Sequence, residues 1–140
     1  ILDDLKSTGE LKGLDIGIIT GYSGQKELLR KSIKATGLDK IASKIDINTL
    51  DAFQGRENDI IIYSTVRTRD SIGFQKEKER VNVAFSRAKK LLIVCGDKNF
   101  FYNFDDQDNK FVEIISLRKK NVKLYNAMEE SYLKENLIHK

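Results

Sequence analysis

The sequence of 140 residues contains 40% hydrophobic and 33% charged residues and has a formal net charge of +4, which is typical of one globular domain. Its longest clean apolar run, residues 91–95, is far shorter than the ~20 residues of a membrane-spanning helix, so we expect no membrane association. A single cysteine, Cys95, cannot form an internal disulfide, and we expect a reduced, cytoplasmic setting and a monomer.

Positive charge is concentrated in one segment of the chain. Residues 67–90 hold eight lysines and arginines against three acidic residues, a local charge of +5. The remaining chain has 17 basic and 18 acidic residues, or −1. A basic segment in an otherwise balanced domain indicates a polyanionic partner, either the phosphates of a nucleotide or a nucleic-acid backbone. A solvated, lysine-rich loop is the structural alternative.

Strand and helix patterns alternate from the first third of the chain onward. Residues 16–20 form a short apolar run that predicts a strand, and turn residues follow at 21–24. Helical spacing comes next, with Ser23 as the expected N-cap and Gly37 as the C-terminal stop. The expected apolar face of this helix consists of Leu28, Leu29, Ile33 and Thr36.

Three more strands are predicted in the middle of the chain, together with one helix. Residues 44–48 alternate in polarity, and residues 59–64 and 91–96 each contain a continuous apolar run. A helix is expected at residues 79–89, between the last two strands. The tail predicts two helices and a short strand, at residues 110–119, 126–134 and 122–125.

Continuous apolar runs are typical of strands buried on both faces, as in a parallel sheet covered by helices. With strands and helices alternating in so short a chain, the pattern predicts a layered α/β fold. Ligands in such sheets gather at the carboxyl ends of the strands. That rule directs attention to the residues after Thr20, Asn48 and Ser64.

Two polar clusters follow the first two strands. Residues 20–25 contain two glycines, a tyrosine that could stack on a base, and Gln25, although a plain strand-to-helix turn would explain them too. Residues 49–59 combine a hydroxyl, an amide, an arginine and three acids around Gly55, which suggests a backbone pinch against a phosphate or sugar. A structural turn is the alternative for this cluster.

The third cluster lies on the helix predicted at residues 79–89. Its apolar face consists of Val81, Ala84, Phe85 and Ala88. Arg87 emerges near the end of this helix, beside the next strand, where a guanidinium is well placed for a phosphate. An ion pair with a neighbouring acid is the alternative.

In order and spacing, these clusters resemble the late motifs of superfamily 1 helicases, in the branch that includes the RNA helicase of nonsense-mediated decay and related DNA helicases. Residues 16–25 resemble a segment that usually has Thr-Pro-Tyr where this chain has Thr-Gly-Tyr. Residues 51–57 match its Asp-Ala-Phe-Gln-Gly-Arg-Glu segment letter for letter. Residues 82–89 are similar to its Asn-Val-Ala-Leu-Thr-Arg-Ala-Lys motif, with Phe and Ser at the two differing positions. Between these segments, Ser64, Val66, Arg67 and residues 72–74 resemble two further stretches.

The resemblance implies the second RecA-like domain of such a helicase, an α/β fold with a mostly parallel sheet and helices on both faces. Residues 1–140 would form one domain, with core motifs at 15–97 and a helical tail at 98–140. ATP is the implied cofactor, with Arg87 as a catalytic arginine finger on its γ-phosphate. The other implied nucleotide-binding residues are Gln54, Gly55, Arg56 and Glu57. Single-stranded DNA or RNA is the implied partner of Thr20, Tyr22, Gln25, Thr49 and Arg67.

A phosphate loop of the form Gly-x-x-x-x-Gly-Lys-[Ser/Thr] does not occur in these 140 residues. Neither does an Asp-Glu pair at the end of an apolar strand, which would hold Mg²⁺. The family places both in an upstream RecA-like domain, so the resemblance implies the ATP-binding and nucleic-acid-binding half of an ATP-dependent helicase or translocase. By itself this half is predicted to be inactive. A non-catalytic nucleic-acid-binding or protein-docking module of the same fold is the alternative, and intact residues 54–57 and Arg87 argue against it.

Overall fold

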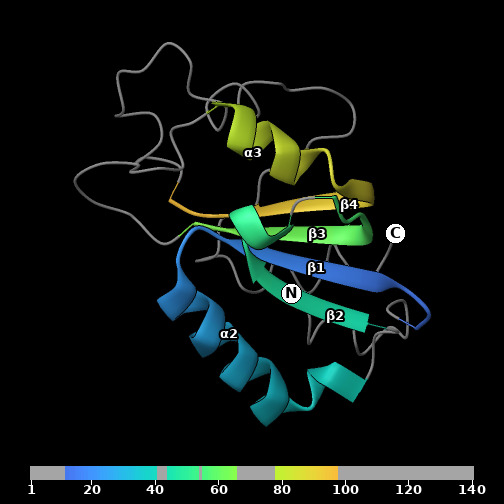
Figure 1. Cartoon of the computed structure of the whole chain (residues 1–140). Helices are drawn as coiled ribbons and strands as arrows, with labels where there is room; N and C mark the ends of the chain where they lie inside the picture. Colours follow the sequence, from blue (N-terminus) through green and yellow to red (C-terminus); the bar gives the residue numbers. More distant parts are fainter. Residues whose placement is uncertain (1–11, 41–43, 54, 66–77, 98–140) are drawn as a thin grey trace.

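The computed structural model describes residues 12–40, 44–53, 55–65 and 78–97, which form a four-stranded, all-parallel sheet flanked by helices (Figure 1). The sheet order is β2-β1-β3-β4. In chain order, the elements are β1 (Asp15–Thr20), α2 (Ser23–Thr36), η1 (Leu38–Lys40), β2 (Lys44–Thr49), η2 (Asp51–Phe53), β3 (Asn58–Ser64), α3 (Lys78–Phe85) and β4 (Ala88–Cys95). The predicted α/β, RecA-like class is confirmed. The elements predicted for the tail lie outside the described residues.

Alternate side chains of the strands supply two separate hydrophobic cores, one on each face of the sheet. One core packs against α2 and η1, and its buried residues are Ile16, Ile18, Ile33, Leu38, Ile47, Ile60 and Ile62. The other packs against α3 and η2, and its buried residues are Ile19, Leu50, Phe53, Ile61, Tyr63, Val81 and Ala84. Burying each such side chain contributes roughly 1.5–3 kcal/mol, so the two layers account for most of the drive to fold.

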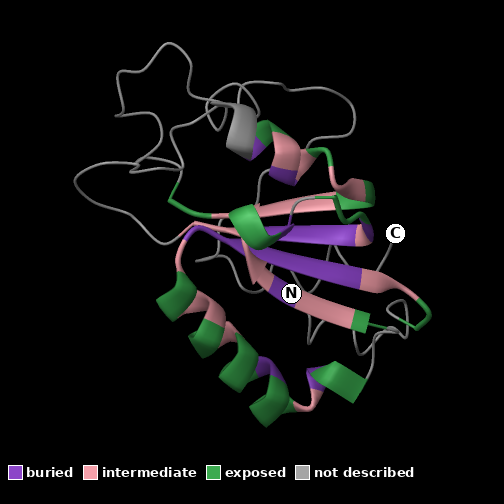
Figure 2. Cartoon of the chain, in the orientation of Figure 1, coloured by how far each residue is buried: buried purple, intermediate pink, exposed green. Residues whose placement is uncertain are grey.

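Burial decreases from the middle of the sheet to its edges. Strands β1 and β3 are mostly buried, whereas β2 and β4 are largely intermediate (Figure 2). The prediction of burial on both faces is confirmed for β3 and wrong for β4, where Leu91 is 44% exposed. Among the described residues, β4 lies at one end of the sheet and pairs with β3 alone, so it has a free edge.

Helix α2 begins at Ser23, one residue earlier than the predicted Ser23 N-cap would allow. Tyr22 is the N-cap, because its backbone is extended and its carbonyl accepts a 3.1 Å hydrogen bond from Lys26 N. Gly37 ends the helix as predicted, with a left-handed φ of 67° that suits a residue without Cβ. Leu28 does not join the apolar face and is 65% exposed, because the sheet-facing positions are Leu29 and Ile33, one turn apart.

Helix α3 is shorter than predicted at its C-terminal end, and β4 begins three residues before the apolar run. Both differences have one cause. Asn58 N donates a 3.1 Å hydrogen bond to Arg87 O, and Asn58 lies opposite Ala88 in the β3–β4 register, so sheet pairing begins there. The predicted apolar face is confirmed for Val81, Ala84 and Phe85, whereas Ala88 lies in β4. The ring of Phe85 meets the buried Tyr63 ring edge to face at 5.4 Å. Within the described residues no helix has the length and apolarity needed to span a bilayer.

Candidate functional site

The carboxyl ends of the four strands form a row of polar side chains. In the register of the sheet, Thr49 lies opposite Thr20, Thr20 opposite Ser64, and Ser64 opposite Cys95. Parallel strands with this order place three hydroxyl groups and one thiol along a single edge. Burial raises the pKa of the Cys95 thiol, so this end of the row carries no charge near neutral pH.

A chain of side-chain hydrogen bonds joins two of these strand ends to helix α2. The Thr20 hydroxyl donates to Gln25 Oε1, and Gln25 Nε2 donates to Ser64 Oγ at 2.9 Å. Thr20 is completely buried, and its carbonyl accepts a 3.0 Å hydrogen bond from Leu50 N. The structure therefore commits the polar groups of Thr20 and Gln25 to contacts inside the domain.

Tyr22 and Thr49 occupy the same edge and are only half-buried. Tyr22 stands at the start of α2 on an extended backbone. The Thr49 hydroxyl makes no hydrogen bond to another described residue. Four of the five residues predicted on the nucleic-acid side are thus brought together at the carboxyl edge, and the fifth, Arg67, lies outside the described residues.

The second predicted cluster is divided between the two edges of the sheet. It begins at Thr49, at the carboxyl end of β2, and reaches the amino end of β3 at Asn58. Gly55, Arg56 and Glu57 come just before β3 and are all exposed. The expectation that ligand-binding residues follow the carboxyl ends therefore holds for the start of this cluster but not for its end. Gln54 lies outside the described residues.

Gly55 provides an open stretch of backbone beside the amino end of β3. Its φ is +78°, a conformation that favours glycine, and no atom of another described residue beyond its chain neighbours lies within 4 Å of the position a Cβ would take. A ligand could approach this backbone closely, next to the exposed Glu57 carboxylate, which is suited to accept hydrogen bonds from hydroxyl groups.

Arg87 lies at the same amino edge, joined to this turn through the backbone bond from Asn58 N to its carbonyl. Its Nε donates to Val83 O at 3.1 Å, which anchors the guanidinium on the last turn of α3. In the part of the chain that the structure describes, no carboxylate lies within ion-pair distance of Arg87, and its two terminal nitrogens bond no other residue. Among the described residues, Arg87 therefore does not form the ion pair with a neighbouring acid that was the alternative prediction.

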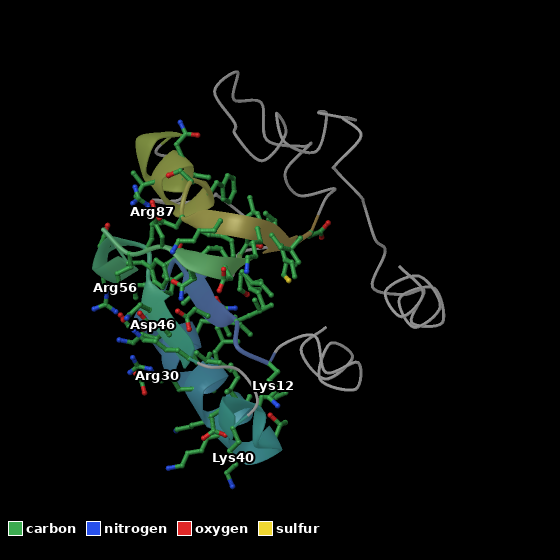
Figure 3. All side chains as sticks on the ribbon, turned by 90° about the vertical axis from the view of Figure 1, so that its right-hand side faces the viewer. Lys12, Arg30, Lys40, Asp46, Arg56 and Arg87 are labelled. Carbon is green, nitrogen blue, oxygen red and sulfur yellow. The ribbon has the colours of Figure 1, made fainter. Side chains whose placement is uncertain are left out.

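Arg56 differs from Arg87 because it does have a partner within the domain. Its Nη1 forms an ion pair with Asp46 Oδ2 on β2, and Asn48 Nδ2 donates to the other oxygen of Asp46 at 3.0 Å. Figure 3 shows Arg87, Arg56, Asp46 and Arg30 following one another along one side of the molecule. Arg56 is thus held toward β2 by its pairing with Asp46.

The amino ends of three strands are tied together by Asp59 on β3. Its Oδ2 accepts a 3.1 Å hydrogen bond from Asp15 N at the start of β1, and its Oδ1 pairs with Lys90 Nζ of β4 at 3.0 Å. The backbone bond from Asp15 first, and Lys90 second, hold the pKa of Asp59 below its usual value. Neither this contact nor Asp46 was assigned a role from the sequence, because only the strand order reveals their neighbours.

The described residues can be tested for their fit to Mg²⁺ and, separately, to ATP. Among residues 12–40, 44–53, 55–65 and 78–97, no group of three or more His, Cys, Asp or Glu side chains could hold a metal ion. The amino edge does offer groups that fit parts of a nucleotide: the open backbone at Gly55, the Glu57 carboxylate for hydroxyls and the Arg87 guanidinium for phosphate. These residues fit one side of a nucleotide.

Residues 1–99 and several related proteins show which family this chain belongs to. A family model described as an AAA domain matches residues 1–99. An uncharacterised ATP-dependent helicase of Methanocaldococcus jannaschii is 37% identical over 119 residues, covering 85% of this chain and 16% of that protein. The regulator of nonsense transcripts 1 homologue of Drosophila melanogaster is 44% identical over 91 residues, covering 62% of the chain and 8% of the relative.

A third relative is the DNA polymerase alpha-associated DNA helicase A of Schizosaccharomyces pombe, 40% identical over 91 residues, with 64% of the chain and 13% of the relative covered. The chain thus spans between 8% and 16% of the length of these three relatives. Because the family model covers well over half of the 140 residues, the chain belongs to the AAA domain family and is a domain of the superfamily 1 helicase type.

Proposed function

We propose that this domain is the second of two RecA-like halves of an ATP-dependent DNA or RNA helicase or translocase. In this proposal an upstream domain of the same protein holds the ATP phosphates and Mg²⁺, and this domain supplies Arg87. The relatives named as helicases support the activity, and because they are far longer than this chain, the proposal assigns the activity to a larger protein. A monomeric state and a cytoplasmic location stay predictions.

The observation that carries the proposal is the separation of two sets of residues by the length of the sheet. Tyr22 and Thr49 lie at the carboxyl edge, whereas Glu57 and Arg87 lie at the amino edge. A motor needs two binding sites that are distinct but mechanically joined, and a rigid parallel sheet of buried strands joins these two. A domain that bound only nucleic acid would not require the second set.

Arg87 is suited to stabilise charge that develops during phosphoryl transfer. The Nε bond to Val83 O fixes the guanidinium, while the terminal nitrogens make no bond to the described residues. Such a group can bind the γ-phosphate of ATP held by the facing domain and neutralise its developing charge. Attraction between Arg87 and the γ-phosphate would close the two domains, and its loss after hydrolysis would let them separate.

The carboxyl edge would contact a single strand of nucleic acid. Tyr22 offers a ring on which a base can stack, and the Thr49 hydroxyl can bond a phosphate oxygen. Both contacts are independent of base identity, so we expect little sequence preference. Thr20 and Gln25 belong to this proposed site as well, but their polar groups are already bonded within the domain, so they would act by supporting it. Arg67 is assigned to it by the resemblance alone.

The test is to replace Arg87 in the full-length protein. Arginine fingers contribute roughly 10³–10⁵ in turnover, so Arg87→Ala should abolish strand-stimulated ATP hydrolysis and leave strand affinity without nucleotide nearly unchanged. Arg87→Lys should restore little, because an ammonium lacks the planar fork of a guanidinium. Lys89→Ala is the matched control, since it removes an exposed positive charge two residues away on β4.

Phosphate release, strand binding by fluorescence anisotropy and melting temperature should be measured on each variant. A lower melting temperature with near-normal turnover in Arg87→Ala would show that Arg87 has only a structural role. If the full-length wild-type protein bound strands but hydrolysed no ATP, the non-catalytic binding module would be the correct description.

A further inference from the structure

Hydrogen bonds to Thr20 hold both the segment that carries Tyr22 (residues 21–25, here called the Tyr22 turn) and the residue that follows β2. Its carbonyl accepts the bond from Leu50 N, directly after Thr49, and its hydroxyl donates to Gln25, three residues after Tyr22. Thr20 is completely buried, so it can reach a ligand only through these neighbours. One residue therefore sets the relative positions of the two side chains that the proposed function places against a strand.

The far end of this chain of bonds is Ser64. Gln25 Nε2 donates to Ser64 Oγ at 2.9 Å, which attaches the first turn of α2 to the carboxyl end of β3. Because Thr20 also lies opposite Ser64 in the sheet register, the three side chains close a small ring of backbone and side-chain contacts. The amide of Gln25 is engaged at both its oxygen and its nitrogen, so the ring fixes the orientation of this side chain.

We propose that Ser64 is a positioning residue for nucleic-acid binding, acting through Gln25 and Thr20 to hold the Tyr22 turn in its binding conformation. This inference rests on the proposed function. Ser64 itself need not touch the strand. Removing its hydroxyl leaves the Gln25 amide without its partner on β3, so the connection at residues 21–22 and the first turn of α2 sample more conformations and binding must first select the correct one.

The predicted effect is a lower affinity for the strand, although the side chains that contact the strand are unchanged. Deleting one neutral hydrogen bond of this kind should weaken strand binding about 5- to 10-fold, the change expected from a net bond contribution near its usual size. Ser64→Ala and Gln25→Ala should each weaken binding, and the double variant should bind no more weakly than Gln25→Ala alone, because Gln25→Ala already removes the link to Ser64. Thr20→Ser keeps the hydroxyl that bonds Gln25 and should bind more tightly than Thr20→Val, which loses it.

Thr65→Val is the matched control, because Thr65 is the next residue and its hydroxyl bonds Cys95 O at 3.0 Å outside this ring. Strand affinity of the full-length protein should be measured by fluorescence anisotropy with several unrelated oligonucleotides, well below each variant's melting temperature. A purely structural role would lower the melting temperature of Thr65→Val and Ser64→Ala alike and leave both affinities unchanged. If Ser64→Ala does not fold, Gln25→Leu breaks the same link from the helix side.

Non-additive losses for Ser64→Ala and Gln25→Ala, with recovery in Thr20→Ser, are the expected result. Wild-type affinity in Ser64→Ala, or fully additive losses in the double variant, would overturn the positioning role while leaving the proposed function intact. A full-length wild-type protein that binds no single strand would overturn the proposed function and this inference with it.

Discussion

The two edges of the sheet handle their polar groups in opposite ways. At the carboxyl edge, the side chains of Thr20, Gln25 and Ser64 bond one another, and Thr20 is fully buried. At the amino edge, Glu57 is exposed and Arg87 has terminal nitrogens that bond none of the described residues. The first arrangement shapes a surface in advance, whereas the second presents charge to a group that another molecule or domain must supply.

This difference matches the chemistry that each edge is proposed to perform. Binding a nucleic-acid backbone whatever its base sequence needs a surface of fixed shape, which internal hydrogen bonds provide. Transition-state stabilisation needs a charge held in place but not neutralised beforehand. We therefore expect substitutions at the two edges to affect different measurements.

Among the substitutions that compare the two edges, the largest expected effects come from Tyr22→Ala and Glu57→Gln, each made singly in the full-length protein. Tyr22→Ala should weaken strand binding roughly 5- to 150-fold, the range for one stacked base, with the KM for ATP measured at saturating strand unchanged. Glu57→Gln should do the reverse, raising the KM for ATP and leaving strand affinity without nucleotide unaltered. Anisotropy and steady-state phosphate release report the two quantities. If both variants changed both quantities alike, the edges would not be separate sites.

A smaller effect is expected from substitution of Gly17 on β1, which η2 covers through Phe53. A Cβ at this position would come 2.5 Å from Phe53 Cζ and 2.6 Å from Ile61 Cδ1. Gly17→Ala should therefore cost about 1–3 kcal/mol of unfolding free energy by overpacking and displace η2, which leads to Gly55. Urea denaturation measures the cost, and the KM for ATP should rise more than the strand Kd.

Gly24→Ala is the control for Gly17→Ala, since Gly24 lies in α2 with no atom within 4 Å of its Cβ position. An added methyl group there should be neutral or slightly stabilising, because alanine favours helix. Equal destabilisation by the two substitutions would contradict the close contact between Phe53 and β1.

The smallest expected effect is a pH-dependent loss of stability at the amino edge, where Asp59 pairs with Lys90. The pKa of Asp59 is lowered in the folded state, so its contacts stabilise fully above the unfolded-state value of ~3.9 and are lost as pH falls through the folded-state value. Lys90→Ala should lower the melting temperature slightly at neutral pH, and the difference from wild type should disappear in acid. Lys89→Ala, its exposed neighbour, should show a smaller change. A difference that persisted in acid would exclude Asp59 as the partner responsible.

The strands were predictable because their burial leaves a direct mark on the sequence. Ile60, Ile61 and Ile62 belong to a strand buried on both faces, and Ile45 and Ile47 to one buried on a single face. The ends were less predictable because they depend on partners. Sheet pairing at Asn58 shortens α3, and adjacent leucines cannot both face the sheet, which leaves Leu28 exposed.

The residues of the candidate site were found from motifs, but their grouping required the strand order. Nothing in the sequence indicates that Gln25 reaches Ser64, 39 residues away, because that contact exists only when β3 lies beside β1. Likewise, the split of residues 49–57 between opposite edges follows from a connection that must travel the length of the sheet before a parallel strand can begin. Local patterns identify chemical groups, and topology decides which of them meet.

One contact described along the side of the molecule also bears on how copies of this domain meet each other. Strand β2 is an end strand of the described sheet, and such a strand presents unpaired backbone groups that invite a foreign strand. Arg30 Nη2 donates a 3.0 Å hydrogen bond to Ile47 O in the middle of β2. An incoming strand would have to displace this guanidinium before it could pair with Ile47 O.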